Sequence, residues 1–349
     1  MASPTTKRRT VGTPPSGWLE KTGSPPWLIA VAALGLVGLV VSLLYVLGTR
    51  NSGESATNGA GLPRTSDYHS LLVAPDALNT LVLGTHQGLF SSADGGRTWK
   101  AGGLTDNDAM NLAQPSADIV WAAGHNVLSQ SRDGGTTWQQ VRPTGLPSLD
   151  VHGFAVDPRN PSRVFAAIAG EGLFRSADGG KSFALVSRQV GPSVMALTIL
   201  PSGRLLAGDM STNTLASSND GGVSWKSVVR AGVMGLAVDP SDGKRVLAAG
   251  PGVLLSTDGG ASWRRTLELD AGAGPIAWSK GEPGTAFVVG FDRSLYRSDD
   301  AGETWTQVTA GEGSEMASLL PLAFVLVCPI VMGLMMLFMM RGRRGSDDD

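Results

Sequence analysis

All four histidines of the chain fall into two columns of a repeated pattern, where they could bind a metal ion. The first column opens a strand in each repeat and reads His69, Met110, His152, Met195, Met234 and Ile276. The second column ends the next strand and reads His86, His125, Gly170, Thr212, Gly250 and Asp292. Imidazole and thioether ligands together suit copper, especially Cu(I). One hypothesis is therefore a copper site formed by His69, His86, His125, His152, Met110, Met195 and Met234. The alternative is that the methionines fill a narrow axis and the histidines hydrogen-bond to loops.

Carboxylates beside the same columns suggest a second kind of chemistry. Asp67, Asp108 and Asp150 each precede a first-column residue by two positions, and Glu171 follows the second column. Hydrolysis of a glycosidic bond needs two carboxyl groups at a suitable separation. Carboxylates in such loops also commonly cap backbone N–H groups, so both interpretations stay open.

The elements that position these residues are defined by the motif S-x-D-x-G-x-[ST]-[WF]. Its aspartates recur at intervals of 39, 45, 42, 38 and 42 residues and are Asp94, Asp133, Asp178, Asp220, Asp258 and Asp300. A period near 40 residues with four short apolar runs is typical of a β-propeller blade. Glycine permits the sharp turn, and aspartate can accept the N–H groups that the turn leaves unpaired. The motif predicts an all-β, six-bladed β-propeller in which these aspartates are structural.

This motif is the Asp-box, and its six copies resemble those of the sialidase-like Asp-box (BNR-repeat) propellers. Ahead of two boxes, residues 85–90 (THQGLF) and 170–174 (GEGLF) are most similar to members described only as glycosyl-hydrolase-like. The resemblance covers about residues 66–310 and extends to the photosystem II assembly factors. It implies either glycosidase activity or a non-catalytic role in holding membrane-protein intermediates.

A sialidase would need an arginine triad, a tyrosine paired with glutamate, and an acidic proton donor. Tyr68 could face the mouth of the central channel, but no particular glutamate pairs with it in the sequence. We therefore expect no enzymatic activity. If the chain is an enzyme, it is a glycoside hydrolase whose candidate residues are Asp67, Tyr68, Asp150 and Glu171.

Two uncharged apolar segments, residues 27–48 and 318–340, are each long enough to span a bilayer as an α-helix. Lysine and arginine precede the first span and follow the second, at Lys7, Arg8, Arg9, Arg341, Arg343 and Arg344. The positive-inside rule then places both termini in the cytoplasm and the propeller on the other side of the cell membrane.

The chain is thus divided into seven segments. They are a disordered cytoplasmic tail (1–26), a signal-anchor helix (27–48), a flexible linker (49–66), the propeller (67–310), a short linker (311–317), a second transmembrane helix (318–340) and a cytoplasmic tail (341–349). Both ends of the propeller are expected to leave from the face that carries the two columns.

The net charge of −2 includes no basic excess that would indicate nucleic-acid binding. The sequence favours a membrane-anchored, extracytoplasmic scaffold whose partners are the lipid bilayer and a membrane or envelope protein. The alternatives are a sialidase-type glycoside hydrolase and a copper-binding or copper-delivery protein. Copper is the one cofactor that the residues suggest.

Overall fold

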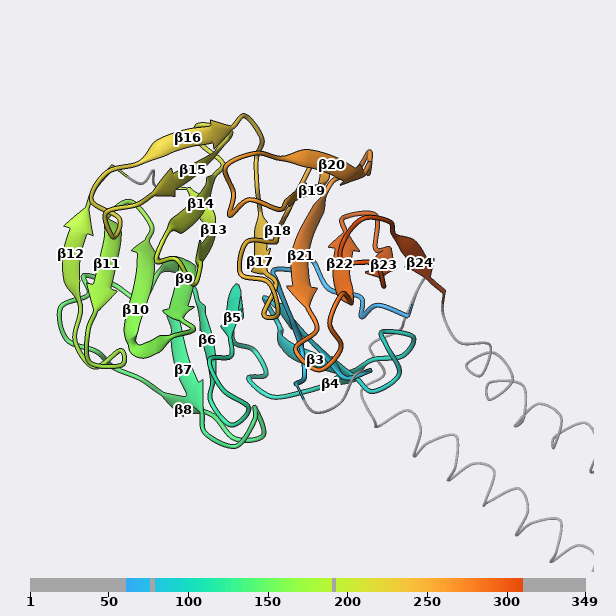
Figure 1. Ribbon diagram of the computed structural model, residues 1–349. Coiled ribbons are helices and arrows are strands. Elements are labelled where there is room, and N and C mark those ends of the chain that lie inside the picture. The colour runs from blue at the N-terminus through green and yellow to red at the C-terminus, as the bar shows by residue number, and fades with distance from the viewer. Residues whose placement is uncertain (1–60, 76–78, 190–192, 310–349) are drawn as a thin grey trace, which may run out of the picture. The chain divides into compact units, whose positions relative to one another are not determined.

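The computed structural model describes residues 61–75, 79–189 and 193–309, which form the six blades of a β-propeller (Figure 1). Each blade is a four-stranded antiparallel sheet. The predicted six-bladed all-β fold is therefore confirmed.

The strands follow one another along the chain from the inner to the outer edge of each blade. Blades 1 to 3 contain β1 (Ser70–Val73), β2 (Leu81–Thr85), β3 (Gly88–Ser92) and β4 (Lys100–Ala101); β5 (Asn111–Ala113), β6 (Val120–Gly124), β7 (Val127–Ser131) and β8 (Gln139–Gln140); β9 (Val151–Asp157), β10 (Asn160–Ile168), β11 (Gly172–Ser176) and β12 (Ala184–Ser187). Blades 4 to 6 contain β13 (Val194–Ile199), β14 (Leu205–Asp209), β15 (Thr214–Ser218) and β16 (Lys226–Val229); β17 (Gly235–Val238), β18 (Val246–Gly250), β19 (Gly252–Ser256) and β20 (Arg264–Leu267); β21 (Ala273–Trp278), β22 (Ala286–Gly290), β23 (Leu295–Ser298) and β24 (Thr306–Val308).

The ring closes through its inner strands, since each contacts the next and β21 returns to contact β1. Blades pack face to face, so their second strands are apolar on both sides, and every residue of β6, β14, β18 and β22 is buried. The outermost strands β4 and β8 are exposed. Burial therefore decreases from the inner to the outer strands. Because the second strands are buried on both faces, their sequences do not alternate strictly between apolar and polar residues.

Each Asp-box forms the turn between the third and fourth strands of its blade. In blade 3, Asp178 Oδ1 accepts the Ser182 N–H at 2.9 Å, and its Oδ2 accepts the Ser182 hydroxyl at 2.6 Å. The buried Ser176 hydroxyl donates to Asp178 and accepts the Gly180 N–H at 2.9 Å. Gly180 has a φ of 83°, which a side chain would strain. The box is thus a self-contained hydrogen-bonded turn.

Residues 61–66 form a strap that packs on the propeller, although the sequence places them in a flexible linker. Leu62 is fully buried beside Phe287 and Leu295 of blade 6, in the same apolar cluster as Trp99 of blade 1. Gly61 lies against the backbone of Arg97 in the first box. The strap therefore begins at the box face, whereas β24 ends at the opposite face. β1 starts and β24 ends at the face that carries the two columns, as the sequence predicts. The strap before β1, however, crosses the seam between blades 6 and 1 and reaches the box face at Gly61.

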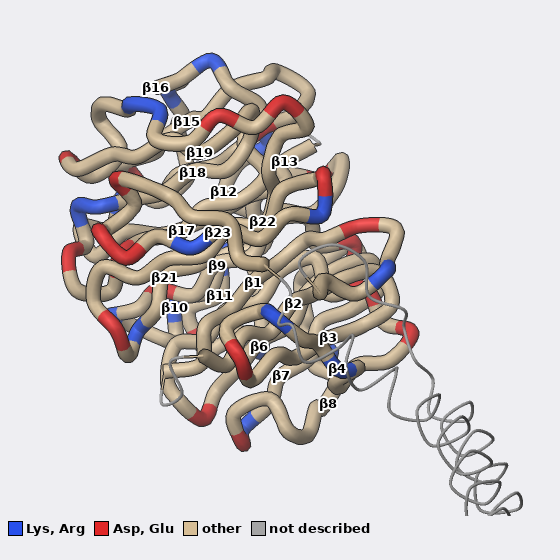
Figure 2. Tube along the Cα trace, turned by 90° about the vertical axis from the view of Figure 1, so that its right-hand side faces the viewer, with Lys and Arg blue, Asp and Glu red and all other residues tan. Residues whose placement is uncertain are grey.

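Charged residues lie mainly on the loops and outer strands. Figure 2 shows acidic and basic positions interspersed on the side in view. Within the described ranges, no helix has the length and hydrophobicity of a membrane span. Both predicted spans, 27–48 and 318–340, lie outside those ranges, as do the two predicted tails and the linker 311–317.

Candidate functional site

The antiparallel pairing of each blade's first two strands brings the two predicted columns to one face. The start of β1 pairs with the end of β2, and the His69 N–H donates to the Gly84 carbonyl at 2.9 Å. His69 and His86 therefore flank the same end of blade 1. Likewise, an isolated bridge between His125 and Asp150 joins the end of β6 to the start of β9. The boxes occupy the other face, where the third strands end.

All four histidines meet in one line of rings, which we name the histidine–aspartate cluster: Asp67, His69, His86, Asp108, His125, Asp150 and His152. The Nε2 atoms of His69 and His86 are 3.1 Å apart, and those of His125 and His152 are also 3.1 Å apart. The His86 and His125 rings are stacked, with centroids 5.9 Å apart. The convergence predicted for the histidines thus occurs, but only over blades 1 to 3.

Three aspartates interleave with these rings. Asp67 Oδ2 lies 3.0 Å from His86 Nε2, and Asp150 Oδ1 lies 3.2 Å from His152 Nε2. The buried Asp108 sits at the centre, with its oxygens 3.0 Å from His86 Nδ1 and 2.5 Å from His125 Nδ1. Each third of the cluster therefore offers two imidazole nitrogens and one carboxylate oxygen within reach of a single ion.

Some polar atoms of the cluster are buried without a hydrogen bond to any residue that the structure describes. They include Asp108 Oδ1 and Asp150 Oδ1. Burial lowers the pKa of His69, and the neighbouring His86 acts in the same direction. A neutral imidazole at His69 keeps a lone pair available for a ligand.

The three methionines of the first column lie around a central cavity rather than in the cluster. Met110, Met195 and Met234 line this narrow cavity of about 80 Å³ together with His69 and Ile276. The predicted ring of histidine and methionine is thus divided into a histidine–aspartate cluster over blades 1 to 3 and a methionine-lined cavity that His69 shares.

The catalytic candidates are spread over different environments. Tyr68 is buried, and its hydroxyl donates to the Pro63 carbonyl at 2.7 Å, while burial raises the pKa of the phenol. Glu171 forms an ion pair with Arg188 at 3.2 Å. Asp67 and Asp150 belong to the histidine–aspartate cluster. The structure brings only the two aspartates into one site.

Asp108 belongs to the histidine–aspartate cluster but is absent from both the copper-site and the catalytic residues predicted from the sequence. Its sequence position carries the signal, because it precedes Met110 by two residues as Asp67 and Asp150 precede His69 and His152. The sequence shows this spacing but not the neighbours of Asp108. The packing of blade 1 against blade 2 places it between His86 of blade 1 and His125 of blade 2.

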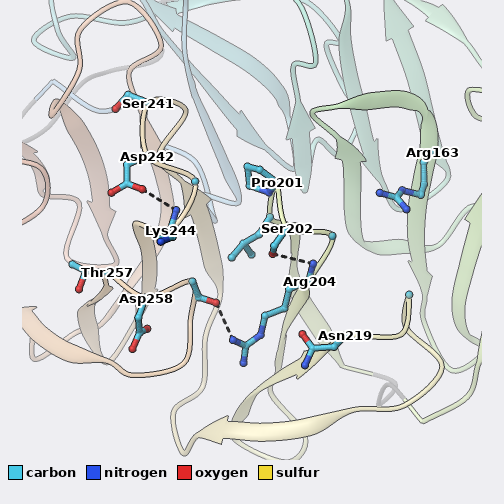
Figure 3. A pocket seen from close by; sticks show the side chains of 15 residues that line it. Arg163, Pro201, Ser202, Arg204, Asn219, Ser241, Asp242, Lys244, Thr257 and Asp258 are labelled. Carbon is cyan, nitrogen blue, oxygen red and sulfur yellow. Dashed lines mark hydrogen bonds between the residues drawn. The ribbon is translucent and has the colours of Figure 1, made fainter.

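A second feature lies on the box face, where a groove of about 1070 Å³ runs between blades 4 and 5 (Figure 3). Arg163, Arg204 and Lys244 line it, and Arg204 donates to the Gly259 carbonyl at 3.0 Å. Of the two acidic residues there, Asp258 is engaged within its own box. The other lining residues belong to turns of blades 4 and 5, so the groove offers cationic groups on a surface of turns. Sequence reasoning missed it because no motif marks it.

Comparison with known proteins identifies relatives of the propeller. A family model described as photosynthesis system II assembly factor YCF48 matches residues 69–325. Among solved structures, YCF48 bound to a D1 peptide is 18% identical over 72% of this chain and 84% of that chain, with a TM-score of 0.47. A GH74 xyloglucanase from Xanthomonas campestris is 19% identical over 72% of this chain and 46% of that chain, with a TM-score of 0.50. A putative gluconolactonase is 14% identical over 70% of this chain and 90% of that chain, with a TM-score of 0.53. No curated protein matches. At these identities the structural likenesses show the fold alone.

Proposed function

Because the chain belongs to the photosynthesis system II assembly factor YCF48 family, we propose that it is a non-catalytic assembly scaffold. It binds a segment of a membrane-protein partner on the propeller while that partner is assembled. The apolar segments 27–48 and 318–340 hold it in the cell membrane with the propeller on the extracytoplasmic side. The family match over residues 69–325 is the observation that carries this proposal.

The environments of the catalytic candidates support a non-catalytic role. A tyrosine nucleophile needs an accessible hydroxyl next to a base, and Tyr68 is buried with its hydroxyl bonded to a backbone carbonyl. Glu171 is exposed and paired with Arg188. These contacts indicate structural roles for Tyr68 and Glu171 in the propeller.

The groove on the box face is the surface that we assign to the partner. It is lined by residues of blades 4 and 5, and an extended peptide is the kind of partner that we assign to it. Lys244 and Arg204 give the groove positive charge for an acidic side chain or a terminal carboxylate, although Arg204 Nη1 and Nη2 already donate to the Gly259 carbonyl and the Ser217 hydroxyl. An acidic, extended segment of a membrane protein therefore fits the groove best.

Affinity purification from detergent-solubilised membranes of the source cells tests this proposal. The full-length chain is compared with the groove variants Lys244→Glu and Arg204→Gln, after cross-linking and identification of bound proteins. We expect a membrane protein to co-purify with the wild type and to be lost from both groove variants. Matched control variants, Lys226→Glu in β16 and Arg142→Gln in the loop after β8, replace exposed cations and should retain the partner.

Retention of the partner by both groove variants would place its binding site elsewhere on the propeller. Absence of any membrane protein, together with hydrolysis of a fluorogenic glycoside, would overturn the scaffold assignment. In that case an Asp150→Asn variant should lose the hydrolysis, because Asp150 would then be one of the two carboxyl groups.

A further inference from the structure

We propose that the histidine–aspartate cluster binds two divalent first-row transition-metal ions. Site A consists of Asp67 Oδ2, His69 Nε2 and His86 Nε2. Site B consists of Asp150 Oδ1, His125 Nε2 and His152 Nε2. Asp108 lies between the two sites and positions one histidine of each.

The facing nitrogen atoms are the first argument. In each site two Nε2 atoms point at one another at 3.1 Å. Two imidazoles that share a tetrahedral ion at Zn–N bonds of about 2.0–2.1 Å would hold their nitrogens roughly 3.3 Å apart. The two pairs are thus already close to the separation that a shared ion requires.

The carboxylate oxygen of site B that lacks a hydrogen bond is the second argument. Asp150 Oδ1 lies 3.2 Å from His152 Nε2 and 3.5 Å from His125 Nε2. It is nevertheless buried without a hydrogen bond to any residue in the described ranges. A buried carboxylate oxygen without a donor is costly, and an ion between these three atoms would satisfy all of them at once.

Asp108 is the carboxylate that positions one histidine ligand of each site from behind, as is usual for metal-binding histidines. Histidine ligands generally donate their second ring N–H to a carboxylate, which fixes the ring and leaves the other nitrogen free for the metal. Asp108 Oδ2 is hydrogen-bonded to His125 Nδ1 at 2.5 Å, and Asp108 Oδ1 lies 3.0 Å from His86 Nδ1 without the geometry of a hydrogen bond. It therefore directs the Nε2 atom of one histidine in each site toward that site's other ligands.

The donor set selects the class of metal. Each site presents two imidazole nitrogens and one carboxylate oxygen, a set that suits Zn²⁺, Cu²⁺ and neighbouring divalent ions better than Cu(I). Three protein ligands leave a coordination position for water or another molecule. The side chains of His125, Asp67 and Asp150 are between two fifths and one half exposed, so ions can reach the rim from solvent.

Metal counting on the purified full-length chain, carried on a tag without histidine, tests the proposal. After treatment with a chelator, the protein is titrated with Zn²⁺ calorimetrically, and its bound zinc is measured by mass spectrometry after dialysis. We expect two ions per chain for the wild type and one for either His69→Ala or His152→Ala. The double variant should bind none. Asp292→Asn, which alters the blade 6 position equivalent to His86, should still bind two.

Asp108→Asn distinguishes the positioning role from direct ligation. If Asp108 acts through His86 and His125, the variant keeps two ions but binds them about 10- to 100-fold more weakly. If an alanine variant fails to fold, the number of bound ions is measured instead for His69→Gln and His152→Gln, which preserve side-chain volume. Absence of saturable binding by the folded wild type overturns the proposal. So does a single ion that survives both histidine variants and is lost in Asp108→Asn, because that ion would lie at the centre of the cluster.

Discussion

At the scale of single residues, the Asp-box aspartates and the cluster aspartates use the same chemical group in opposite ways. Asp133 accepts the Thr137 N–H and hydroxyl and the Ser131 hydroxyl, all within its own turn. Asp108 instead contacts the rings of His86 and His125, which lie in other parts of the chain. The first arrangement follows from local spacing, so the sequence predicts it. The second depends on how blades 1 and 2 meet, and no local pattern contains that information.

The serine of each box is expected to matter for stability because its hydroxyl is buried. Changing Ser176 to alanine removes the acceptor of the Gly180 N–H and the donor to Asp178. A buried group left unsatisfied costs about 1–3 kcal/mol, so the free energy of unfolding should fall by that amount. Urea denaturation measures it. Lys181→Ala, which removes an exposed side chain of the same box, should change stability by less than about 0.5 kcal/mol. Equal effects would mean that the buried hydroxyl is not what stabilises the turn.

The box aspartates also predict how stability depends on pH. The Thr137 hydroxyl, the Thr137 N–H and the Ser131 hydroxyl lower the pKa of Asp133 from 3.8 to about 2. Because the folded pKa lies below the unfolded one, this stabilisation is complete above pH 3.8 and is lost as the pH falls toward 2. Unfolding free energies measured by urea between pH 5 and 2.5 should therefore decrease. Asp133→Asn should make that decrease shallower, and an identical slope would show that Asp133 does not contribute to it.

At the scale of elements, the second strand of a blade is defined by how closely the next blade approaches it. A side chain at Gly208, near the end of β14, would come within 2.2 Å of the Val233 carbonyl oxygen. The sequence shows a glycine there but not the reason for it, since the neighbour is 25 residues away. Strand order and box position were predictable from the repeat; these contacts between blades were not, because they depend on the radius of the ring.

Gly208→Ala should therefore destabilise the seam between blades 4 and 5. The added methyl group must displace backbone rather than a flexible side chain, and overpacking of this kind costs about 1–3 kcal/mol or more. Gly203→Ala is the matched variant, because its φ is 89° but nothing lies within 4 Å of the added atom. Its cost should be limited to backbone strain of about 1 kcal/mol. Thermal unfolding followed by circular dichroism compares the two, and a smaller effect at Gly208 would contradict this view of the seam.

At the scale of the whole molecule, the strap of residues 61–66 takes part in closing the ring. Leu62 is fully buried in the apolar cluster shared by blades 1 and 6. The sequence suggests a linker here because the strap lies outside the Asp-box period and follows a Gly/Ser/Asn-rich stretch. Its burial depends on blade 6, which lies at the other end of the propeller. The repeat thus predicts the number of blades, whereas the closure had to be seen in three dimensions.

Leu62→Ala should consequently destabilise the entire propeller. Truncation of a fully buried leucine costs about 2–5 kcal/mol, depending on how far the cavity collapses. Urea unfolding of the full-length chain measures this loss. Leu185→Ala, at a leucine that is 44% exposed on an outer strand, serves as the control and should cost far less. If both variants lose the same free energy of unfolding, the strap does not contribute to closing the ring.

The strap also has a consequence for biogenesis. Leu62 is made early, but its partners Phe287, Val289 and Leu295 are made more than 220 residues later. Until the last blade emerges from the ribosome, the strap and the open side of blade 1 have no surface to cover them. Contacts this distant along the chain form slowly and leave apolar surface open to aggregation in the meantime. During synthesis of this protein there is therefore an interval in which the first five blades are complete but the apolar surface that blade 6 will cover is still exposed.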